Sequence, residues 1–399
     1  MREDQRMFQA SLKNELVRIR TGLIMGDYPI GDFRRFRIYD PKEREICAAT
    51  FGERVLHHAL MNVCEPYFDR LLVFDSYACR TGKGQIAAVR RARRFAHSCD
   101  WFMKCDFRKY FDSIPHDRLK SALARRFKDP FVLGWFFRII DSYEKSQGRG
   151  LPIGSLTSQH FANLYLDPLD RFLIRRREDG VMGYVRYMDD FVVWAKSKST
   201  LLSLREMIVS FARVELGLEL KQQPFINRTR LGMDFLGMRI FPDAIRLGRA
   251  SRIRYRRRLR GYDEAFRRGE LDELEYQSRV TALTAFTDNA DARGWRKRIW
   301  AACEEQRATT VSCAGAAGTT TPGTAAPRAA TGTIPATATT TTASASVAPQ
   351  HRRIFRAVPA DGPFPQVGTN KNMRGGTSSD AERPAASFFR GIPSVRGTL

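Results

Sequence analysis

The sequence predicts an α+β fold, because it contains both helical and strand-like patterns. Apolar residues recur at helical spacing in segments such as 51–68, whereas 183–194 is a nearly continuous run of β-branched and aromatic residues. The segment 101–106 is a second short apolar run and predicts another strand. Because 43% of the 399 residues are hydrophobic, the chain can build a sizeable core.

The predicted helices follow from apolar spacing and from local start and stop signals. We expect helices at 51–68, 85–96, 115–126, 156–172, 201–216 and, rich in arginine, 252–268. Ser155 follows a glycine-rich loop and opens the helix at 156–172. Gly217 ends the helix at 201–216, since glycine commonly takes the left-handed position after a helix.

The charge of the chain favours a polyanionic partner. Lys and Arg number 67 against 43 Asp and Glu, which gives a formal net charge of +24. Each cation placed on a phosphate releases condensed counterions, so this excess favours nucleic acid binding. The positive charge is spread along the whole chain, whereas binding to an anionic membrane surface would favour one basic amphipathic helix.

Eight of the seventeen residues at 252–268 are arginines, interleaved with apolar residues at helical spacing. This pattern predicts a packed helix that presents guanidinium groups to a nucleic acid backbone. The expected contacts are Arg252, Arg254, Arg256 and Arg257. The alternative is a solvated helix face.

The sequence also predicts a cytoplasmic protein with no membrane partner. No segment approaches the roughly 20 apolar residues of a membrane span, and the N-terminal residues lack the apolar core of a signal peptide. The seven cysteines show neither a CxxC pair nor zinc spacing, which favours small buried hydrophobes in a reducing compartment. From about residue 306 the composition shifts to Ala, Thr, Gly and Pro, which predicts a disordered tail over 306–399.

Two adjacent carboxylates, Asp189 and Asp190, interrupt the apolar run 183–194 and predict a turn between two strands. Adjacent carboxylates in an apolar setting repel each other unless a cation neutralises them, and Mg²⁺ takes oxygen ligands. The alternative for this dipeptide alone is a turn that faces water. Asp106, at the end of the strand 101–106, is a third carboxylate, and nucleotidyl transfer by two metal ions needs such groups from separate elements. Asp112 is the competing choice for this third ligand.

Tyr187-Met-Asp-Asp190 within this hairpin resembles the catalytic motif of reverse transcriptases, and four further segments follow the order of that family over roughly residues 35–300. The resemblance implies that Asp106, Asp189 and Asp190 are catalytic and hold two Mg²⁺ ions, for which Mn²⁺ is a substitute. It also assigns Phe107 to the metal and dNTP sites. Phe111 matches the aromatic residue that lies under the sugar and excludes a 2′-hydroxyl, with a plain core aromatic as the alternative.

The loop before the helix at 156–172 carries a second motif. Most reverse transcriptases have Gln-Gly-x-x-x-Ser-Pro there, whereas this chain has Ile153-Gly154-x-x-x-Ser158-Gln159. The change resembles the enzymes of diversity-generating retroelements, which copy template adenines inaccurately. The resemblance places these four residues at the incoming dNTP. Ile153 removes an amide that could hydrogen-bond near the nascent pair, so discrimination there should be weaker.

Three weaker matches complete the resemblance. Arg80-Thr-Gly-Lys83-Gly resembles the segment that grips the triphosphate in bacterial reverse transcriptases, although alone it would be a surface turn and it lacks P-loop spacing. Lys221, read as closing a short strand, resembles the lysine near the pyrophosphate. Leu236 and Gly237 resemble the hairpin that grips the primer. Tyr187 and Met188 are likewise assigned to nucleic acid binding.

The resemblance implies a right-hand polymerase fold. It places fingers at 1–95, a palm at 96–245 with a fingers insertion at about 113–150, and a short basic helical thumb at 246–305. The implied function is RNA-directed DNA synthesis with an RNA template, a DNA or RNA primer and dNTPs, inside a diversity-generating element, and it leaves open a small basic accessory protein. The alternatives are a retron-like or group II intron-like reverse transcriptase, and a maturase-like RNA-binding scaffold without polymerase activity.

Overall fold

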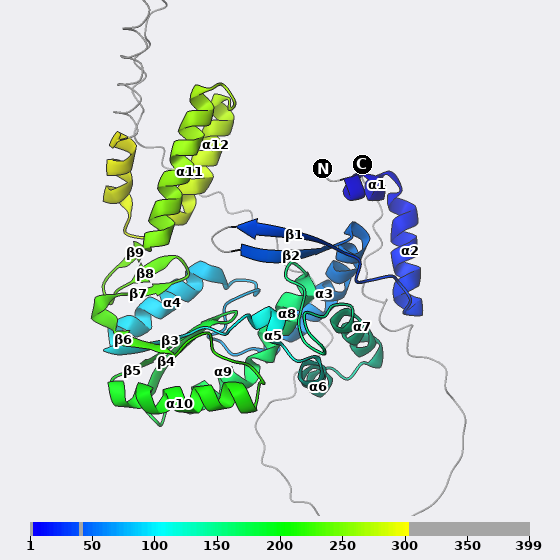
Figure 1. Cartoon of the computed structure of the whole chain (residues 1–399), viewed down its shortest axis with the longest axis horizontal. Coiled ribbons are helices and arrows are strands. Elements are labelled where there is room, and N and C mark those ends of the chain that lie inside the picture. The colour runs from blue at the N-terminus through cyan, green and yellow to red at the C-terminus, as the bar shows by residue number, and fades with distance from the viewer. Residues whose placement is uncertain (1–2, 40–42, 303–399) are drawn as a thin grey trace, which may run out of the picture. The chain divides into compact units, whose positions relative to one another are not determined.

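The computed structural model describes residues 3–39 and 43–302. All of them belong to the first of two units into which the contacts divide the chain, Met1–Thr310 and Val311–Leu399. Helices and three small antiparallel sheets make up the described part (Figure 1), so the predicted α+β class is confirmed. The assignment of fingers, palm and thumb stays a prediction, and the tail expected over 306–399 lies outside the described residues.

The helices confirm all but one of the predicted helical segments, and several further helices lie between them. In chain order they are α1 (Glu3–Ala10), α2 (Leu12–Met25), α3 (Phe51–Leu71), α4 (Gly84–Ser98), α5 (Tyr110–Ser113), α6 (His116–Arg126), α7 (Pro130–Asp141), α8 (Leu156–Tyr165), α9 (Asp167–Arg175), α10 (Lys198–Val214), α11 (Arg249–Arg267) and α12 (Glu273–Ala285). Short 3₁₀ turns are η1 (Thr229–Leu231) and η2 (Phe286–Asn289).

The single helix expected at 156–172 is wrong, because the chain forms α8 and α9 with a break at Leu166. Pro168 explains the break. Proline has no N–H to donate, and its ring would clash with the carbonyl of Leu164 in a continuous helix. In the first turn of α9 the missing N–H costs nothing.

The strands form three separate sheets. Strands β1 (Phe33–Tyr39) and β2 (Glu43–Ala49) form a two-stranded sheet. The four-stranded sheet has the order β4-β5-β3-β6, from β3 (Trp101–Cys105), β4 (Val181–Tyr187), β5 (Asp190–Ala195) and β6 (Phe225–Arg228). The three-stranded sheet consists of β7 (Met233–Phe235), β8 (Met238–Ile240) and β9 (Ile245–Leu247).

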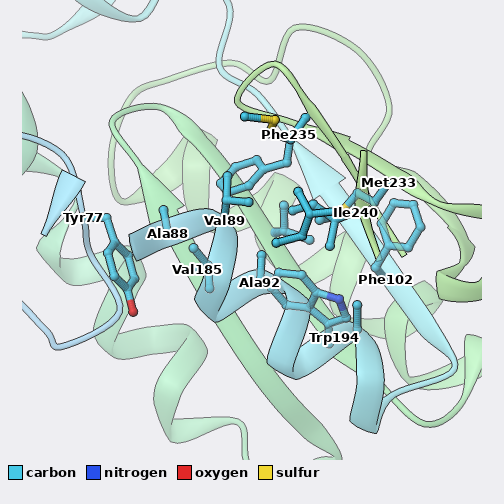
Figure 2. Close-up of a cluster of buried hydrophobic side chains, with 14 of the residues drawn as sticks. Tyr77, Ala88, Val89, Ala92, Phe102, Val185, Trp194, Met233, Phe235 and Ile240 are labelled. Atoms are coloured by element: carbon cyan, nitrogen blue, oxygen red, sulfur yellow. The ribbon is translucent and has the colours of Figure 1, made fainter. Parts of the chain in front are cut away.

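The four-stranded sheet is packed by helices that come from distant parts of the sequence. Helix α10 contacts β3, β5 and β6, whereas α4 contacts β4, β5 and β8. Trp194 of β5 and Phe235 of β7 lie in the core around α4, whose small residues Ala88 and Ala92 let its backbone approach closely (Figure 2). This packing holds the β4–β5 hairpin firmly in place.

A second, smaller cluster joins α11 to α12. Tyr255 and Leu259 of α11 pack against Tyr276 and Val280 of α12. Ile253 of α11 is 57% exposed, so it does not belong to the apolar stripe that packs against α12. Among the described residues, no helix is long and apolar enough to cross a membrane.

Candidate active site

The β4–β5 hairpin turns through two residues only, Met188 and Asp189. Tyr187 pairs with Asp190 across the turn, so Asp190 is the first residue of β5 and lies directly beside the turn. Met188 has a left-handed backbone with φ 56°, which costs a non-glycine residue roughly 1–2 kcal/mol. The turn is therefore a conformation that the surrounding structure must hold.

Asp106 follows β3 directly and meets this turn. Because Cys105 pairs with Phe191 in the antiparallel β3–β5 ladder, the next residue of β3 comes opposite Asp190. The backbone carbonyl of Asp106 accepts a hydrogen bond of 2.9 Å from the Lys221 N–H. Three carboxylates, those of Asp106, Asp189 and Asp190, thus gather at one end of the sheet.

Burial is the main cause that disfavours the charged forms of Asp189 and Asp190, and nearby carboxylates add to it. Burial raises the pKa of Asp189, and repulsion from Asp106 raises it further. Burial also raises the pKa of Asp190 to about 6, although the Lys104 ammonium opposes this shift. Lys104 Nζ lies 3.2 Å from Asp190 Oδ2, and Lys221 Nζ lies 3.5 Å from Asp106 Oδ2. Two ammonium groups therefore already supply positive charge at this site.

The site suits a divalent cation, although its geometry is not that of a preformed metal cage. The Asp190 Oδ1 atom is buried and has no hydrogen-bond partner in the described part of the chain. Such an oxygen is costly unless a cation or a donor reaches it. No group of three or more His, Cys, Asp or Glu side chains among the residues described has a ready-made ligand arrangement. The carboxylate of Asp112, the competing ligand, instead acts on Tyr143 and Lys145 and contributes to raising the pKa of each.

A cavity of about 410 Å³ opens beside Asp106. Its lining includes Lys104, Asp106, Lys221 and Asp234. Lys104 was missed in the sequence analysis, although a lysine inside the apolar strand Trp-Phe-Met-Lys-Cys is a signal that could have identified it. Lys221 does not close a strand as expected. It follows Leu220, which forms an isolated bridge with Phe107.

The two phenylalanines after Asp106 differ in their surroundings. Phe107 is 2% exposed and packs against Tyr110 and Phe191, so only its backbone can face a ligand. Two backbone hydrogen bonds form the bridge between Phe107 and Leu220: the Asp106 carbonyl accepts one, and the Arg108 N–H donates the other. Neither bond uses the Phe107 carbonyl. Phe111 is half-buried with the edge of its ring against Tyr110.

The loop before α8 is held against β2. The Ile153 carbonyl accepts a hydrogen bond of 2.9 Å from the Cys47 N–H, and the Ile153 side chain is partly exposed. Gly154 is exposed with φ 116°, and a Cβ there would lie 3.1 Å from Ile46 Cγ2. Only glycine fits this backbone without strain.

Ser158 and Gln159, two residues of the same motif, have side chains that lie against other parts of the fold. Ser158 is completely buried, and its hydroxyl has no partner within the described residues. In this structure the Ser158 hydroxyl has no exposed surface to offer a dNTP, and its assignment to the dNTP site stays a prediction. Gln159 is partly exposed and accepts a hydrogen bond from the Cys79 thiol at 3.0 Å, which links α8 to the loop that follows α3.

Arg80 and Lys83, the two cations assigned to the triphosphate, lie in the loop between Phe74 and α4 and differ in their surroundings. Arg80 is engaged within the fold, with Nε 2.5 Å from Asp69 Oδ1 and further bonds to the carbonyls of Asp69, Val73 and Ser76. The Arg80 side chain is only 7% exposed and holds this loop, and its contact with the triphosphate stays a prediction. Lys83 is partly exposed and donates to the Phe74 carbonyl at 2.7 Å.

The predicted β7–β8 hairpin and the arginine helix are both present. Leu236 and Gly237 form the two-residue turn, each with positive φ, and their carbonyls accept hydrogen bonds from Gln85 and Ser251. On α11, Arg252, Arg256 and Arg257 are exposed, and Arg254 is half-buried. The described structure thus leaves Arg252, Arg256 and Arg257 of α11 open to solvent, while Tyr255 and Leu259 are buried.

Residues 40–240 match the model of the family described as reverse transcriptase (RNA-dependent DNA polymerase). The chain belongs to this family. The part that matches the reverse transcriptase family contains all three carboxylates, the Ile153–Gln159 motif and the Leu236–Gly237 turn.

Several curated relatives of this reverse transcriptase chain are proteins of introns. The chain is 24% identical over 157 residues to the putative COX1/OXI3 intron 2 protein of Saccharomyces cerevisiae, covering 37% of the chain and 17% of that protein. It is 23% identical over 141 residues to the group II intron-encoded protein LtrA of Lactococcus lactis subsp. cremoris, covering 34% and 23%. Protein YkfC of Escherichia coli K12 is 24% identical over 291 residues, covering 61% and 75%. The chain thus spans less than a quarter of the two intron proteins.

Solved structures that resemble the chain include telomerases. Apo telomerase from Candida tropicalis has a TM-score of 0.42 and 14% identity, covering 54% of this chain and 48% of that chain. Telomerase from Candida tropicalis in complex with a TWJ fragment of telomeric RNA has a TM-score of 0.43 and 13% identity, covering 64% and 52%.

Proposed function

We propose that this protein is an RNA-directed DNA polymerase that extends a primer on an RNA template with dNTPs. The observation that carries the proposal is the meeting of Asp106, Asp189 and Asp190 at one end of the β3–β5 ladder, inside the part that matches the reverse transcriptase family. A scaffold that only binds RNA has no need for three mutually repelling carboxylates. Their cost in a half-buried site is explained by a charged reaction partner.

Two Mg²⁺ ions, or Mn²⁺ in their place, would be held by these carboxylates and by the Phe107 carbonyl. Bound there, such ions stabilise negative charge on the attacking and leaving oxygens of nucleotidyl transfer. The chain's own residues supply the rest. Phe111 would lie under the sugar, and Lys83 would contact the phosphates. Lys221, 3.5 Å from Asp106, would protonate the leaving pyrophosphate.

The diversity-generating type is the finer part of the proposal, and Ile153 and Gln159 support it. Ile153 offers shape without an amide beside the nascent pair, which favours inaccurate copying. The intron-encoded relatives favour a second candidate, a group II intron-like reverse transcriptase. The error spectrum opposite template adenines separates the two. An RNA-binding scaffold without polymerase activity is excluded if purified protein extends a primer.

Asp189→Asn tests the proposed activity directly. Loss of a charged ligand at the turn should remove several kcal/mol of transition-state stabilisation, a fall in primer extension on the order of 10³-fold. RNA binding should stay nearly unchanged, because removing one carboxylate charge leaves the phosphate contacts intact. Extension of a DNA primer on a defined RNA with dNTPs and Mg²⁺ measures this.

Asp112→Asn is the matched control, because it makes the same chemical change six residues after Asp106 and outside the carboxylate group. It should retain extension within a few-fold. Substantial dNTP incorporation by Asp189→Asn at wild-type protein levels would contradict the assignment.

A further inference from the structure

We propose that Arg186 and Asn163 form a buried junction that positions two segments against each other. These are the catalytic turn, Met188–Asp189, and the nucleotide loop, residues 75–83. The inference rests on the proposed function, since it concerns residues that act through Asp189 and Lys83. Neither residue belongs to the motifs that identified the site. Arg186 is 0% exposed and Asn163 is 1% exposed, so both act as positioning residues without touching substrate.

All five N–H groups of the Arg186 guanidinium have acceptors. Nε donates to Asp170 Oδ1 at 2.6 Å, and Nη2 donates to Asp170 Oδ2 at 2.5 Å and to the Asn163 carbonyl at 3.1 Å. Nη1 donates to Asn163 Oδ1 at 2.7 Å and to the Met188 carbonyl at 3.0 Å. Buried charges are tolerated when they are paired and fully hydrogen-bonded, and this one meets both conditions.

The bond to the Met188 carbonyl reaches the catalytic turn itself. Met188 is the residue with the left-handed backbone, directly before Asp189. A rigid donor on its carbonyl fixes the orientation of the Met188–Asp189 peptide, and thereby the direction of the Asp189 side chain. Lysine cannot replace this function, because one ammonium group cannot serve Asp170, Asn163 and Met188 in the planar arrangement of a guanidinium.

The same junction holds the start of the nucleotide loop. Arg186 N–H donates to the Asp75 carbonyl at 2.9 Å, and its carbonyl accepts from the Tyr77 N–H at 2.9 Å. Asn163 Nδ2 donates to the Ala78 carbonyl at 2.7 Å. The segment 75–78 leads within five residues to Lys83. One pair of residues thus contacts α9, the catalytic turn and the nucleotide loop.

The two arms of the junction have different consequences. If Arg186 is shortened, the turn loses its fixed carbonyl and Asp189 shifts relative to the other carboxylates. A misplacement of about 1 Å costs on the order of 10²-fold in rate. If only the Asn163–Ala78 bond is lost, the nucleotide loop moves while the turn stays. The first change should lower kcat and metal affinity, and the second should raise KM for dNTP.

The experiment compares Arg186→Lys, Asn163→Asp and the control Tyr184→Phe in the full chain. Tyr184 Oη donates to Asp170 Oδ1 at 2.5 Å, so Tyr184→Phe perturbs the same buried network without touching Met188 or the segment 75–78. Asn163→Asp keeps an oxygen for Arg186 but replaces the donor to Ala78. The readouts are kcat, KM for dNTP, the Mg²⁺ concentration for half-maximal rate, and the rise in Tm caused by Mn²⁺.

We expect Arg186→Lys to lower kcat about 10- to 100-fold, to raise the half-maximal Mg²⁺ concentration and to shrink the Mn²⁺-induced rise in Tm. Asn163→Asp should raise KM for dNTP about 10-fold and leave the Mn²⁺ response unchanged. Tyr184→Phe should leave all four readouts within two-fold of wild type. A merely structural role would lower Tm and active fraction without moving Mg²⁺ dependence or KM.

The proposal is overturned if folded Arg186→Lys keeps the wild-type kcat and Mn²⁺ response, or if Tyr184→Phe behaves like it. Should Arg186→Lys not fold, Asn163→Asp still decides, because an unchanged KM for dNTP removes the junction's role at the nucleotide loop. A wild-type protein that never extends a primer contradicts the proposed function instead. The Mn²⁺ response then still tests Arg186, since it needs no activity.

Discussion

The partial exposure of the Phe111 side chain supports a role for it under the sugar of the nucleotide. A core aromatic would be fully buried like its neighbour Tyr110, which is 3% exposed, whereas Phe111 is half-buried at the start of α5. Its carbonyl accepts a hydrogen bond of 2.8 Å from the Leu151 N–H, which ties α5 to the loop that leads to Ile153. A side chain held in this way can serve as a steric floor for a sugar.

Phe111→Ala should therefore admit ribonucleotides. Truncating the ring leaves room for a 2′-hydroxyl, so the preference for dNTP over rNTP should fall, on the order of tenfold or more. The ratio of incorporation efficiencies for the two substrates measures this. Tyr110→Phe, which keeps the ring and loses only the hydroxyl bond to the Ala162 carbonyl, is the control. An unchanged ratio in folded Phe111→Ala would show that Phe111 is a plain core aromatic and does not exclude the 2′-hydroxyl.

Glu53 and His57 give the pH dependence of stability a definite sign. Both are buried on α3, with Glu53 Oε1 3.6 Å from His57 Nε2, and His57 Nδ1 3.2 Å from the Ser155 hydroxyl before α8. Burial raises the pKa of Glu53 to about 7, with a further contribution from Asp32. Burial lowers the pKa of His57 to about 4, helped by His58.

The two shifts oppose each other in the wild type. Folded Glu53 keeps a proton that the unfolded chain loses near its ordinary pKa, so its contribution to stability falls as the pH rises toward 7. Folded His57 lacks a proton that the unfolded chain still holds, so its contribution rises with pH from about 4 to 6.5. In Glu53→Gln only the rise from His57 remains.

Glu53→Gln should consequently be more stable than wild type at pH 7.5, by about 1–3 kcal/mol, and no more stable at pH 4.5. Denaturant unfolding at the two pH values measures the difference. Glu178→Gln, at an exposed position, should show no such gain. If Glu53→Gln gains nothing at pH 7.5, burial does not hold the proton on Glu53.

Elements differ in how far the sequence determines them. Apolar spacing predicted α3, α4, α6, α10 and α11 to within a few residues, because each buries one stripe of a continuous segment. The break at Leu166 was missed, although Pro168 is a local signal for it. The sheet order β4-β5-β3-β6 and the Arg186–Asp170 pair could not be predicted, since they join residues through the tertiary fold alone.

The same distinction holds for the candidate site. Asp106, Asp189 and Asp190 were identified because each follows or interrupts an apolar strand. Arg80 and Ser158 were placed at the nucleotide by motif alone, and only the structure shows the bonding partners of Arg80 and the complete burial of Ser158. Burial of a polar side chain depends on what packs over it, which spacing does not encode.

The loop before α8 makes the fidelity prediction specific. The Ile153 backbone is fixed by the Cys47 N–H, so a change of side chain should leave the loop in place. Ile153→Gln should raise copying accuracy, most visibly opposite template adenines, because a polar group left unsatisfied by a mispair penalises it. The expected gain is about 1–2 kcal/mol of discrimination, on the order of tenfold in misincorporation.

Sequencing of cDNA copied from one defined RNA checks this, with Ile153→Leu as an aliphatic control that should copy as wild type does. Equal adenine error spectra for Ile153→Gln and wild type would mean that Ile153 does not set fidelity. They would also weaken the proposal of a diversity-generating type.

For the whole molecule, the dominant property is its formal net charge of +24. A charge of this size attracts any polyanion, so RNA affinity alone does not identify a binding surface. The dependence of affinity on salt is more informative, because it counts the phosphates that cations neutralise. On α11, Arg256 and Arg257 are exposed and Arg254 is half-buried, while Tyr255 and Leu259 anchor the helix to α12.

RNA binding should therefore weaken steeply with salt, and replacing Arg254, Arg256 and Arg257 by Gln should flatten that dependence. Each phosphate contact contributes about 0.7 to the log–log slope for a single strand and about 0.9 for a duplex, so three lost contacts should lower it by about 2 to 3. The same loss of charge at Arg125, Arg175 and Arg177, which are exposed on α6, on α9 and just after α9, provides the comparison. Equal slopes for the two triple variants would show that net charge alone acts. A wild-type slope in the α11 variant would show that its arginines form a solvated face. A lower slope in the α11 variant alone would show that α11 contacts the nucleic acid.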